Sequence, residues 1–233
     1  MAFRDRLLAS LRAMQPVLDV PGVLVGGSQV PNLLEPGAAS TLVVSQDVDL
    51  VVPVERHAEV KAALDRVEGY APSADEPSVW LPRAADRLEV NFIGSDRALR
   101  DAADTYLLKD DRLPLLVFGL LSQLREGPRL ELPGLRVPLP RAAGLLIEKL
   151  LTERSGLKGE RDLLVALGLL LVSQPADLDE LAAIYTTLDD QQRSAVLGNL
   201  AVLSLMKPIP EMPDPTTARA IVAQLVRRLE ALA

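Results

Sequence analysis

Two aspartates separated by one residue are the side chains of this sequence best suited to chemistry. Asp47 and Asp49 lie in the stretch DVDLVVP. In an extended strand, residues two apart project to the same face, so the two carboxylates point together while Val48 and Leu50 point into the core. Neighbouring carboxylates repel each other unless a cation lies between them, and hard oxygen ligands select Mg²⁺ or Mn²⁺. Such a pair can hold one or two cations that neutralise triphosphate oxygens and stabilise a leaving pyrophosphate. The alternative for an isolated Asp-x-Asp is a solvated strand edge or turn.

A glycine-rich turn precedes the acidic pair. Gly26, Gly27 and Ser28 follow the short apolar run VLV. Glycine lacks the Cβ atom that would keep a ligand away from the backbone, and exposed N–H groups at a helix start receive anions. The same three residues are equally compatible with a simple turn, so their value depends on what lies opposite them.

A second strand, RLEVNFI, carries further polar side chains. By strand alternation Glu89 and Asn91 share one face, opposite Leu88, Val90 and Phe92. We expect Glu89 to be the general base or a second cation ligand. If Asn91 occupies that position instead, proton abstraction lacks its carboxylate, and the protein would bind a nucleotide without turning it over.

The elements that must position these residues change character near residue 139. An amphipathic helix over 3–15, strands ending at Gly26 and containing Asp47, a helix over 55–70 and a strand over 87–94 predict a sheet domain. Short strand-like runs occupy 112–139. Helical patterns then follow at 140–154, 158–172, 177–187, 189–205 and 215–232. We therefore expect an α/β domain over 1–139 and a helical domain over 140–233.

Composition narrows the classes of function. The chain of 233 residues has no cysteine and a single histidine, which argues against disulfides, thiolate metal sites and His-based zinc sites. Few aromatic residues and a net charge of -7 disfavour base stacking and nonspecific binding to nucleic acid. Neither a signal peptide nor a membrane span is expected, so a cytoplasmic location is the default.

The combination of a Gly-Gly-Ser turn, an Asp-x-Asp strand and a later acidic strand resembles the nucleotidyltransferase superfamily related to DNA polymerase β. The matching residues are Gly26, Gly27, Ser28, Asp47 and Asp49. The resemblance implies an α+β fold, with a nucleotidyltransferase-like mixed sheet and flanking helices followed by a helical C-terminal domain. It also implies an NTP substrate bound at the turn and Mg²⁺ or Mn²⁺ at the aspartates.

A narrower resemblance lies in the helical half. In LLIEKLLTERSGLKGERDLL, the residues Lys149, Arg154, Lys158, Arg161 and Asp162 follow a pattern similar to that of the AbiEii-type nucleotidyltransferases, which are toxins of toxin-antitoxin pairs. SQDVDLV also resembles their Thr-x-Asp-x-Asp-Leu. This resemblance implies that Lys149 binds a β- or γ-phosphate, that Asp162 orients Lys149 or Arg154, and that an antitoxin protein is a partner. The alternative for Lys149 is a solvated lysine beside Glu148, and for the others a salt-bridge network.

Departures from the family pattern keep a second function open. Val43 stands where these relatives have an arginine. The position of the family's third carboxylate is taken either by Glu89 or by Asn91. The leading interpretation is a metal-dependent nucleotidyltransferase acting on a hydroxyl of RNA, a protein or a small molecule. The alternative is a catalytically weakened fold that serves as a nucleotide-binding or protein-interaction module. A third is a helical adaptor whose Asp-x-Asp is accidental.

Overall fold

The computed structural model describes residues 3–27, 30, 33, 47–99, 101, 103–151, 157–205 and 215–232, with the backbone alone for 157–161 and 215–218. The described residues form two compact units: those within 1–30 and 45–140 belong to the first, and Leu33 and those from Arg141 onward belong to the second. The expected α+β class is confirmed, with a mixed sheet, flanking helices and a helical C-terminal part. Among the described residues, no helix combines the length and the apolar character that a membrane span requires.

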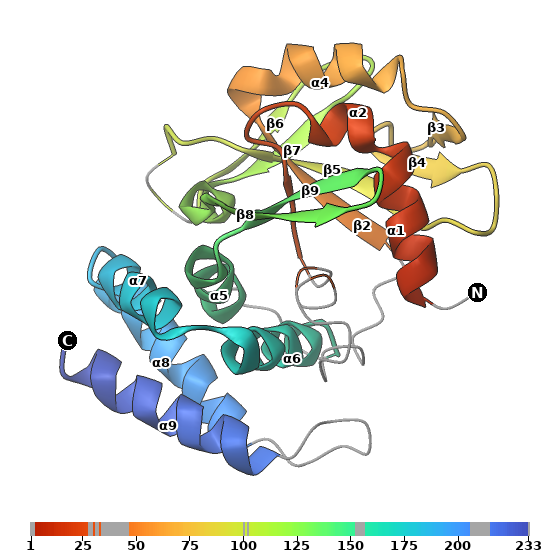
Figure 1. Ribbon diagram of the computed structural model, residues 1–233. Helices are drawn as coiled ribbons and strands as arrows, with labels where there is room; N and C mark the ends of the chain where they lie inside the picture. Colours follow the sequence, from red (N-terminus) through yellow and green to blue (C-terminus); the bar gives the residue numbers. More distant parts are fainter. Residues whose placement is uncertain are drawn as a thin grey trace. The chain divides into compact units, whose positions relative to one another are not determined.

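The first unit is built on a seven-stranded sheet (Figure 1). Its main path runs in the order β1-β2-β5-β4-β3, and β7 pairs with both β5 and β6. Strands β2 and β5 are parallel, as are β5 and β7, whereas the other pairs are antiparallel. The strands are β1 (Leu24–Val25), β2 (Asp47–Pro53), β3 (Tyr70–Pro72), β4 (Val79–Pro82), β5 (Glu89–Ser95), β6 (Thr105–Leu108) and β7 (Leu115–Phe118).

One face of the central strands forms the core of this unit. Val48, Leu50 and Val52 of β2 are fully buried, and so is Val90 of β5. Phe92 continues this face and meets Trp80 of β4 edge to face, with ring centroids 6.1 Å apart. The alternation in the sequence therefore places these apolar side chains on one side of the sheet and the polar residues at the starts of β2 and β5 on the other.

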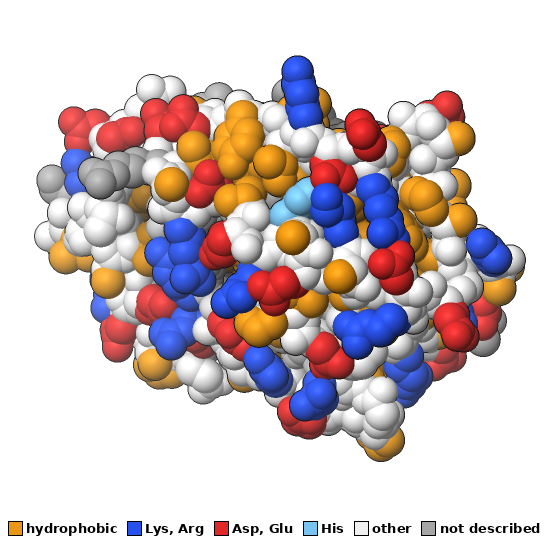
Figure 2. Space-filling view, turned by 90° about the horizontal axis from the view of Figure 1, so that it is seen from above, with side chains coloured by type: hydrophobic (Ala, Val, Ile, Leu, Met, Phe, Trp, Pro, Cys, Tyr) orange, Lys and Arg blue, Asp and Glu red, His pale blue; other side chains and the backbone are white. Residues whose placement is uncertain are grey.

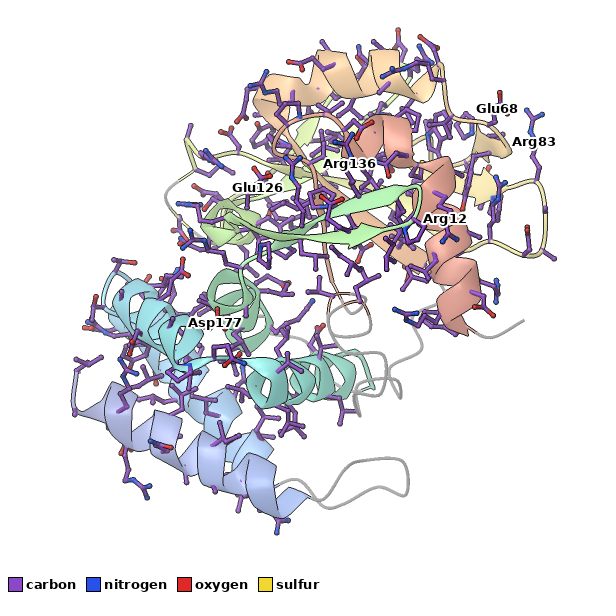
Figure 3. The ribbon with its side chains drawn as sticks, viewed as in Figure 1. Arg12, Glu68, Arg83, Glu126, Arg136 and Asp177 are labelled. Atoms are coloured by element: carbon purple, nitrogen blue, oxygen red, sulfur yellow. The ribbon has the colours of Figure 1, made fainter. Side chains whose placement is uncertain are left out.

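Helices flank the sheet, and a hairpin packs beside it. The helices are α1 (Phe3–Ala13), α2 (Gln15–Leu18) and α4 (His57–Leu64), with 3₁₀ segments η2 (Val54–Arg56) and η3 (Gly119–Gln123). The hairpin consists of β8 (Glu126–Leu132) and β9 (Leu135–Pro140). Arg136, labelled in Figure 3, docks β9 on α2: its backbone N–H donates to Gln15 Oε1 (2.9 Å), and its guanidinium lies 3.2 Å from Asp19 Oδ1.

The prediction of a helix over 55–70 is wrong about the length of the helix. Helix α4 ends at Leu64, and Tyr70 begins β3 instead. Gly69 adopts φ +77° immediately before β3, and the Tyr70 hydroxyl donates to the backbone oxygen of Leu88 at 2.7 Å. The buried bond and the β3–β4 pairing outweigh the helical pattern of this stretch.

The second unit is helical. Its helices are α5 (Ala142–Leu151), α6 (Leu157–Val172), α7 (Pro175–Tyr185), α8 (Asp190–Leu205) and α9 (Pro215–Glu230), drawn from green to blue in Figure 1. Helix α5 is buried from Ala143 to Leu150 and contacts α6, α7 and α8, so it is the central helix of this unit. Asn199 of α8 donates to the last-turn carbonyl of Leu150 at 2.7 Å. Asp177, labelled in Figure 3, accepts the N–H of Gln174 at 2.8 Å and closes a capping box at the start of α7.

Candidate functional site

The two aspartates begin strand β2. Asp47 and Asp49 are partly exposed, whereas Val48 and Leu50 are fully buried. Strand alternation therefore presents both carboxylates on the same side of the sheet, away from the core. Since β2 and β5 are parallel, the same edge of the sheet also receives the first residues of β5.

The Gly-Gly turn lies directly against the second aspartate. The N–H of Gly26 donates to the backbone oxygen of Asp49 at 2.9 Å, which extends the antiparallel pairing of β1 and β2. Gly27 has φ +67°, and a Cβ atom at this position would lie 2.6 Å from Asp49 Oδ2. A side chain at Gly27 would thus collide with the carboxylate, and the left-handed backbone would disfavour it in any case. The third residue of the motif, Ser28, lies outside the described residues.

Asn91 lies between the two carboxylates. Its Nδ2 group donates to Asp47 Oδ2 at 2.8 Å and to Asp49 Oδ1 at 3.3 Å. The other end of the amide, Oδ1, is buried and has no hydrogen-bond partner among the described residues. The amide therefore bridges the acidic pair through its donor end and leaves an unused acceptor beside it.

Glu89 lies next to the first aspartate. It pairs with Asp47 across β2 and β5, and its side chain is on the same face as that of Asn91. Burial raises the pKa of Glu89 above its ordinary value, and the negative charges of Asp47 and Glu76 raise it further. A carboxylate with a raised pKa is a stronger base, which suits it to accept a proton from a hydroxyl group.

The start of β5 is fixed by side chains from outside the strand. The Leu88 N–H donates to the buried Ser10 Oγ at 2.7 Å, while Tyr70 holds the Leu88 carbonyl. Arg6 Nη2 donates to the carbonyl of Arg87 at 3.0 Å. We name Arg6, Ser10 and Tyr70 the β5 clamp. Sequence reasoning missed it, although a fully buried serine on the apolar face of helix α1 is a signal of an internal hydrogen bond.

The residues present fit a hard divalent cation. Within the described part of the chain, no group of three or more His, Cys, Asp or Glu side chains is arranged to hold a metal ion. The oxygen donors that face one another are therefore the carboxylates of Asp47 and Asp49, and Asn91 presents its Nδ2 group to both of them. Carboxylate oxygens are hard donors that suit Mg²⁺ or Mn²⁺.

Lys149 lies in the second unit, in a buried group of charges on α5 and α6. Its Nζ atom is 3.0 Å from Glu148 Oε2 and 3.2 Å from Asp162 Oδ1. Burial alone would lower the pKa of Lys149, but the two carboxylates outweigh it and raise the pKa above its ordinary value. The structure thus shows the contact between Lys149 and Asp162. Arg154 and the side chains of Lys158 and Arg161 lie outside the described residues.

Charges of both signs are interspersed around α4. Figure 2 shows His57, the single histidine, among basic and acidic side chains, and its Nε2 atom lies 2.8 Å from the Leu113 carbonyl oxygen. Lys61 pairs with Asp110, and Arg112 pairs with Asp65. A surface of paired charges lacks the excess of positive charge that a nucleic-acid backbone attracts.

Comparisons with known proteins leave the family of this chain undefined. No family model matches the sequence, and no curated protein matches it significantly. Solved structures with a similar fold include the antibiotic-resistance factor ANT(2'')-Ia, with 13% identity, 84% of this chain and 98% of that chain covered, and a TM-score of 0.40. A candidate nucleotidyltransferase from H. pylori has 14% identity over 100% of this chain and 99% of that chain, with a TM-score of 0.37. JHP933 from Helicobacter pylori has 13% identity over 100% of this chain and 94% of that chain, with a TM-score of 0.35.

A likeness at this level carries no weight for function. All three TM-scores are below 0.5, and all three identities are below 25%. Function is therefore inferred from the chemistry of the residues around β1, β2 and β5.

Proposed function

We propose that this protein is a metal-dependent nucleotidyltransferase, which transfers a nucleotidyl group from an NTP to a hydroxyl acceptor. The observation that carries the proposal is the meeting of the Gly-Gly turn with the acidic pair, where a Cβ atom on Gly27 would lie 2.6 Å from Asp49 Oδ2. A backbone free of side chains and a pair of carboxylates are thereby brought to one place. This is the combination that a cation-bound phosphate chain requires.

Each residue of the site has a distinct part in the proposed reaction. Gly26, Gly27 and Ser28 receive the phosphates, and Asp47 and Asp49 hold the cation. Bound Mg²⁺ or Mn²⁺ would neutralise charge on the phosphate oxygens.

In the transfer itself, the acceptor oxygen forms a bond to the α-phosphorus while the bond to the β-phosphate oxygen breaks and pyrophosphate leaves. Glu89 takes the proton of the acceptor hydroxyl, and the raised pKa of Glu89 supports this role.

Lys149 remains a predicted phosphate ligand within this proposal. Its ammonium group already contacts Glu148 and Asp162, so a phosphate would have to compete with two carboxylates for it. The division into domains over 1–139 and 140–233 likewise remains part of the proposal.

A toxin role and an antitoxin partner rest on the AbiEii-like motifs alone. Growth arrest on induced expression in bacteria, relieved by Asp47→Ala, would support the toxin role. Normal growth under strong expression of the wild-type protein would count against it.

The test of the proposed activity uses each NTP labelled at the α-phosphate, with Mg²⁺ or Mn²⁺, and total bacterial RNA or a protein extract as the source of hydroxyl groups. We expect transfer by the wild-type protein and none by Asp47→Ala. Asp75→Ala, which removes an exposed carboxylate outside the acidic pair, is the matched control and should keep the activity. Saturable NTP binding without transfer would support a nucleotide-binding module instead. Absence of metal-dependent NTP binding by the wild-type protein would refute both.

A further inference from the structure

Asn91 occupies a position on β5 where its side chain reaches both aspartates. It pairs with Asp49 across the parallel strands, and its amide group bridges the two carboxylates at 2.8 and 3.3 Å. A hydrogen bond from a neutral amide to a carboxylate is charge-assisted and holds the acceptor in place. Asn91 therefore offsets the repulsion between Asp47 and Asp49 without carrying a charge of its own.

The same amide has an unsatisfied end. Asn91 Oδ1 is buried and has no hydrogen-bond partner in the part of the chain that the structure describes, and a buried acceptor in that state is unfavourable. A half-turn of the last side-chain torsion exchanges Nδ2 and Oδ1. Between two carboxylates alone that exchange is repulsive, because three oxygens would then face one another. With a cation at the pair the preference reverses, since a cation repels the NH₂ group and attracts the carbonyl oxygen.

We propose that Asn91 is the third ligand of a single divalent cation at Asp47 and Asp49, and that its amide turns over when the cation binds. The inference rests on the proposed function for the presence of a cation. Two carboxylates and one neutral oxygen carry a total charge of −2, which balances one divalent cation. A carboxylate at position 91 would add another negative charge and favour a second cation.

The test measures Mn²⁺ binding by the full-length protein without nucleotide, using electron paramagnetic resonance to count free ions. We expect one Mn²⁺ per chain for the wild-type protein. Asn91→Leu, which keeps the size of the side chain and removes its oxygen, should lower the affinity about tenfold or more. Asn91→Asp should bind Mn²⁺ at least as tightly and take up a second ion. Asp75→Asn, which removes an exposed carboxylate outside the acidic pair, should keep the wild-type affinity.

Two further measurements distinguish an effect on protein stability from an effect on cation binding. Asn91→Asp should have a lower melting temperature than the wild-type protein without metal, and it should gain more from added Mn²⁺. In nuclear magnetic resonance spectra, the side-chain amide signals of Asn91 should shift when Mg²⁺ is added.

Some outcomes would overturn the role of Asn91 alone. Wild-type Mn²⁺ affinity in a folded Asn91→Leu protein, together with loss of binding in Asp49→Asn, would exclude Asn91 as a ligand and leave the proposed transferase intact. If the Asn91→Asp protein binds only one Mn²⁺ ion, the inference that the neutral amide limits the site to a single cation is refuted. Absence of Mn²⁺ binding by the wild-type protein would count against both proposals.

Discussion

Gly27→Ala perturbs the contact between the glycine turn and the acidic pair in two separable ways. Alanine at φ +67° is strained, which costs about 1–2 kcal/mol for an L-residue in the left-handed region. In addition, its Cβ atom would lie 2.6 Å from Asp49 Oδ2, so the carboxylate must retreat by about 0.8 Å to reach an ordinary contact of 3.4 Å. The first effect acts on stability, and the second acts on the position of a predicted cation ligand.

Gly134 offers a matched control for the first effect. It lies in the turn between β8 and β9 with φ +68°, and a Cβ atom there would meet nothing within 4 Å. Gly134→Ala therefore imposes the same backbone strain without a collision. We expect both variants to lower the free energy of unfolding by about 1–2 kcal/mol. A further decrease in stability from the collision with Asp49 is expected for Gly27→Ala alone.

Urea denaturation followed by the fluorescence of Trp80 measures the stability of the first unit. Trp80 is the single tryptophan and is 5% exposed. Mn²⁺ titration of the same variants measures the site, and there we expect Gly27→Ala to lose about tenfold or more in affinity while Gly134→Ala keeps the wild-type value. Equal Mn²⁺ affinity in the two variants would refute the inference that the turn and the carboxylate share one site.

Three further substitutions test the surroundings of the site and the buried charges. Ser10→Ala leaves the Leu88 N–H buried without a partner and should cost about 1–3 kcal/mol in the urea assay; an unchanged midpoint would contradict a structural role for the β5 clamp. Lys149→Met removes the ammonium group that pairs with two buried carboxylates and should lower the free energy of unfolding, followed by circular dichroism, by about 3–5 kcal/mol; a neutral effect would show that these two ion pairs contribute little. Glu89→Gln should stabilise the protein at pH 7, because a carboxyl group whose pKa is raised on folding costs stability once it is ionised. That gain should disappear as the pH falls below the ordinary range for Glu, and a gain independent of pH would contradict the assignment.

Local periodicity predicted the side of the sheet on which the acidic pair lies. Val48 and Leu50 alternate with Asp47 and Asp49, and the burial of the two apolar residues dictates the direction of the other two. The Gly-Gly turn could be predicted for a similar reason, because a positive φ and a close approach both favour glycine. Its direct contact with Asp49 could not, since that contact arises from the antiparallel pairing of β1 with β2.

The sequence alone could not decide whether Glu89 or Asn91 reaches the two aspartates. Both residues share one face of β5, and the register of β5 against β2 decides which of them reaches the two aspartates. Register is fixed by hydrogen bonds between strands far apart in the chain, which no local pattern records. The burial of Lys149 was hidden for a related reason, because its partner Asp162 belongs to another helix.

The β5 clamp has a consequence for the synthesis of the protein. Ser10 and Leu88 are 78 positions apart, so the ribosome completes helix α1 long before the strand that it must hold has been made. At about 5–20 residues per second, this interval lasts roughly 4–16 s. During that time the apolar face of α1, with the fully buried Leu7 and Leu11, lacks its final partner. The nascent chain therefore exposes this apolar face throughout the interval, and the acidic site becomes complete only after β5 has emerged and paired with β2.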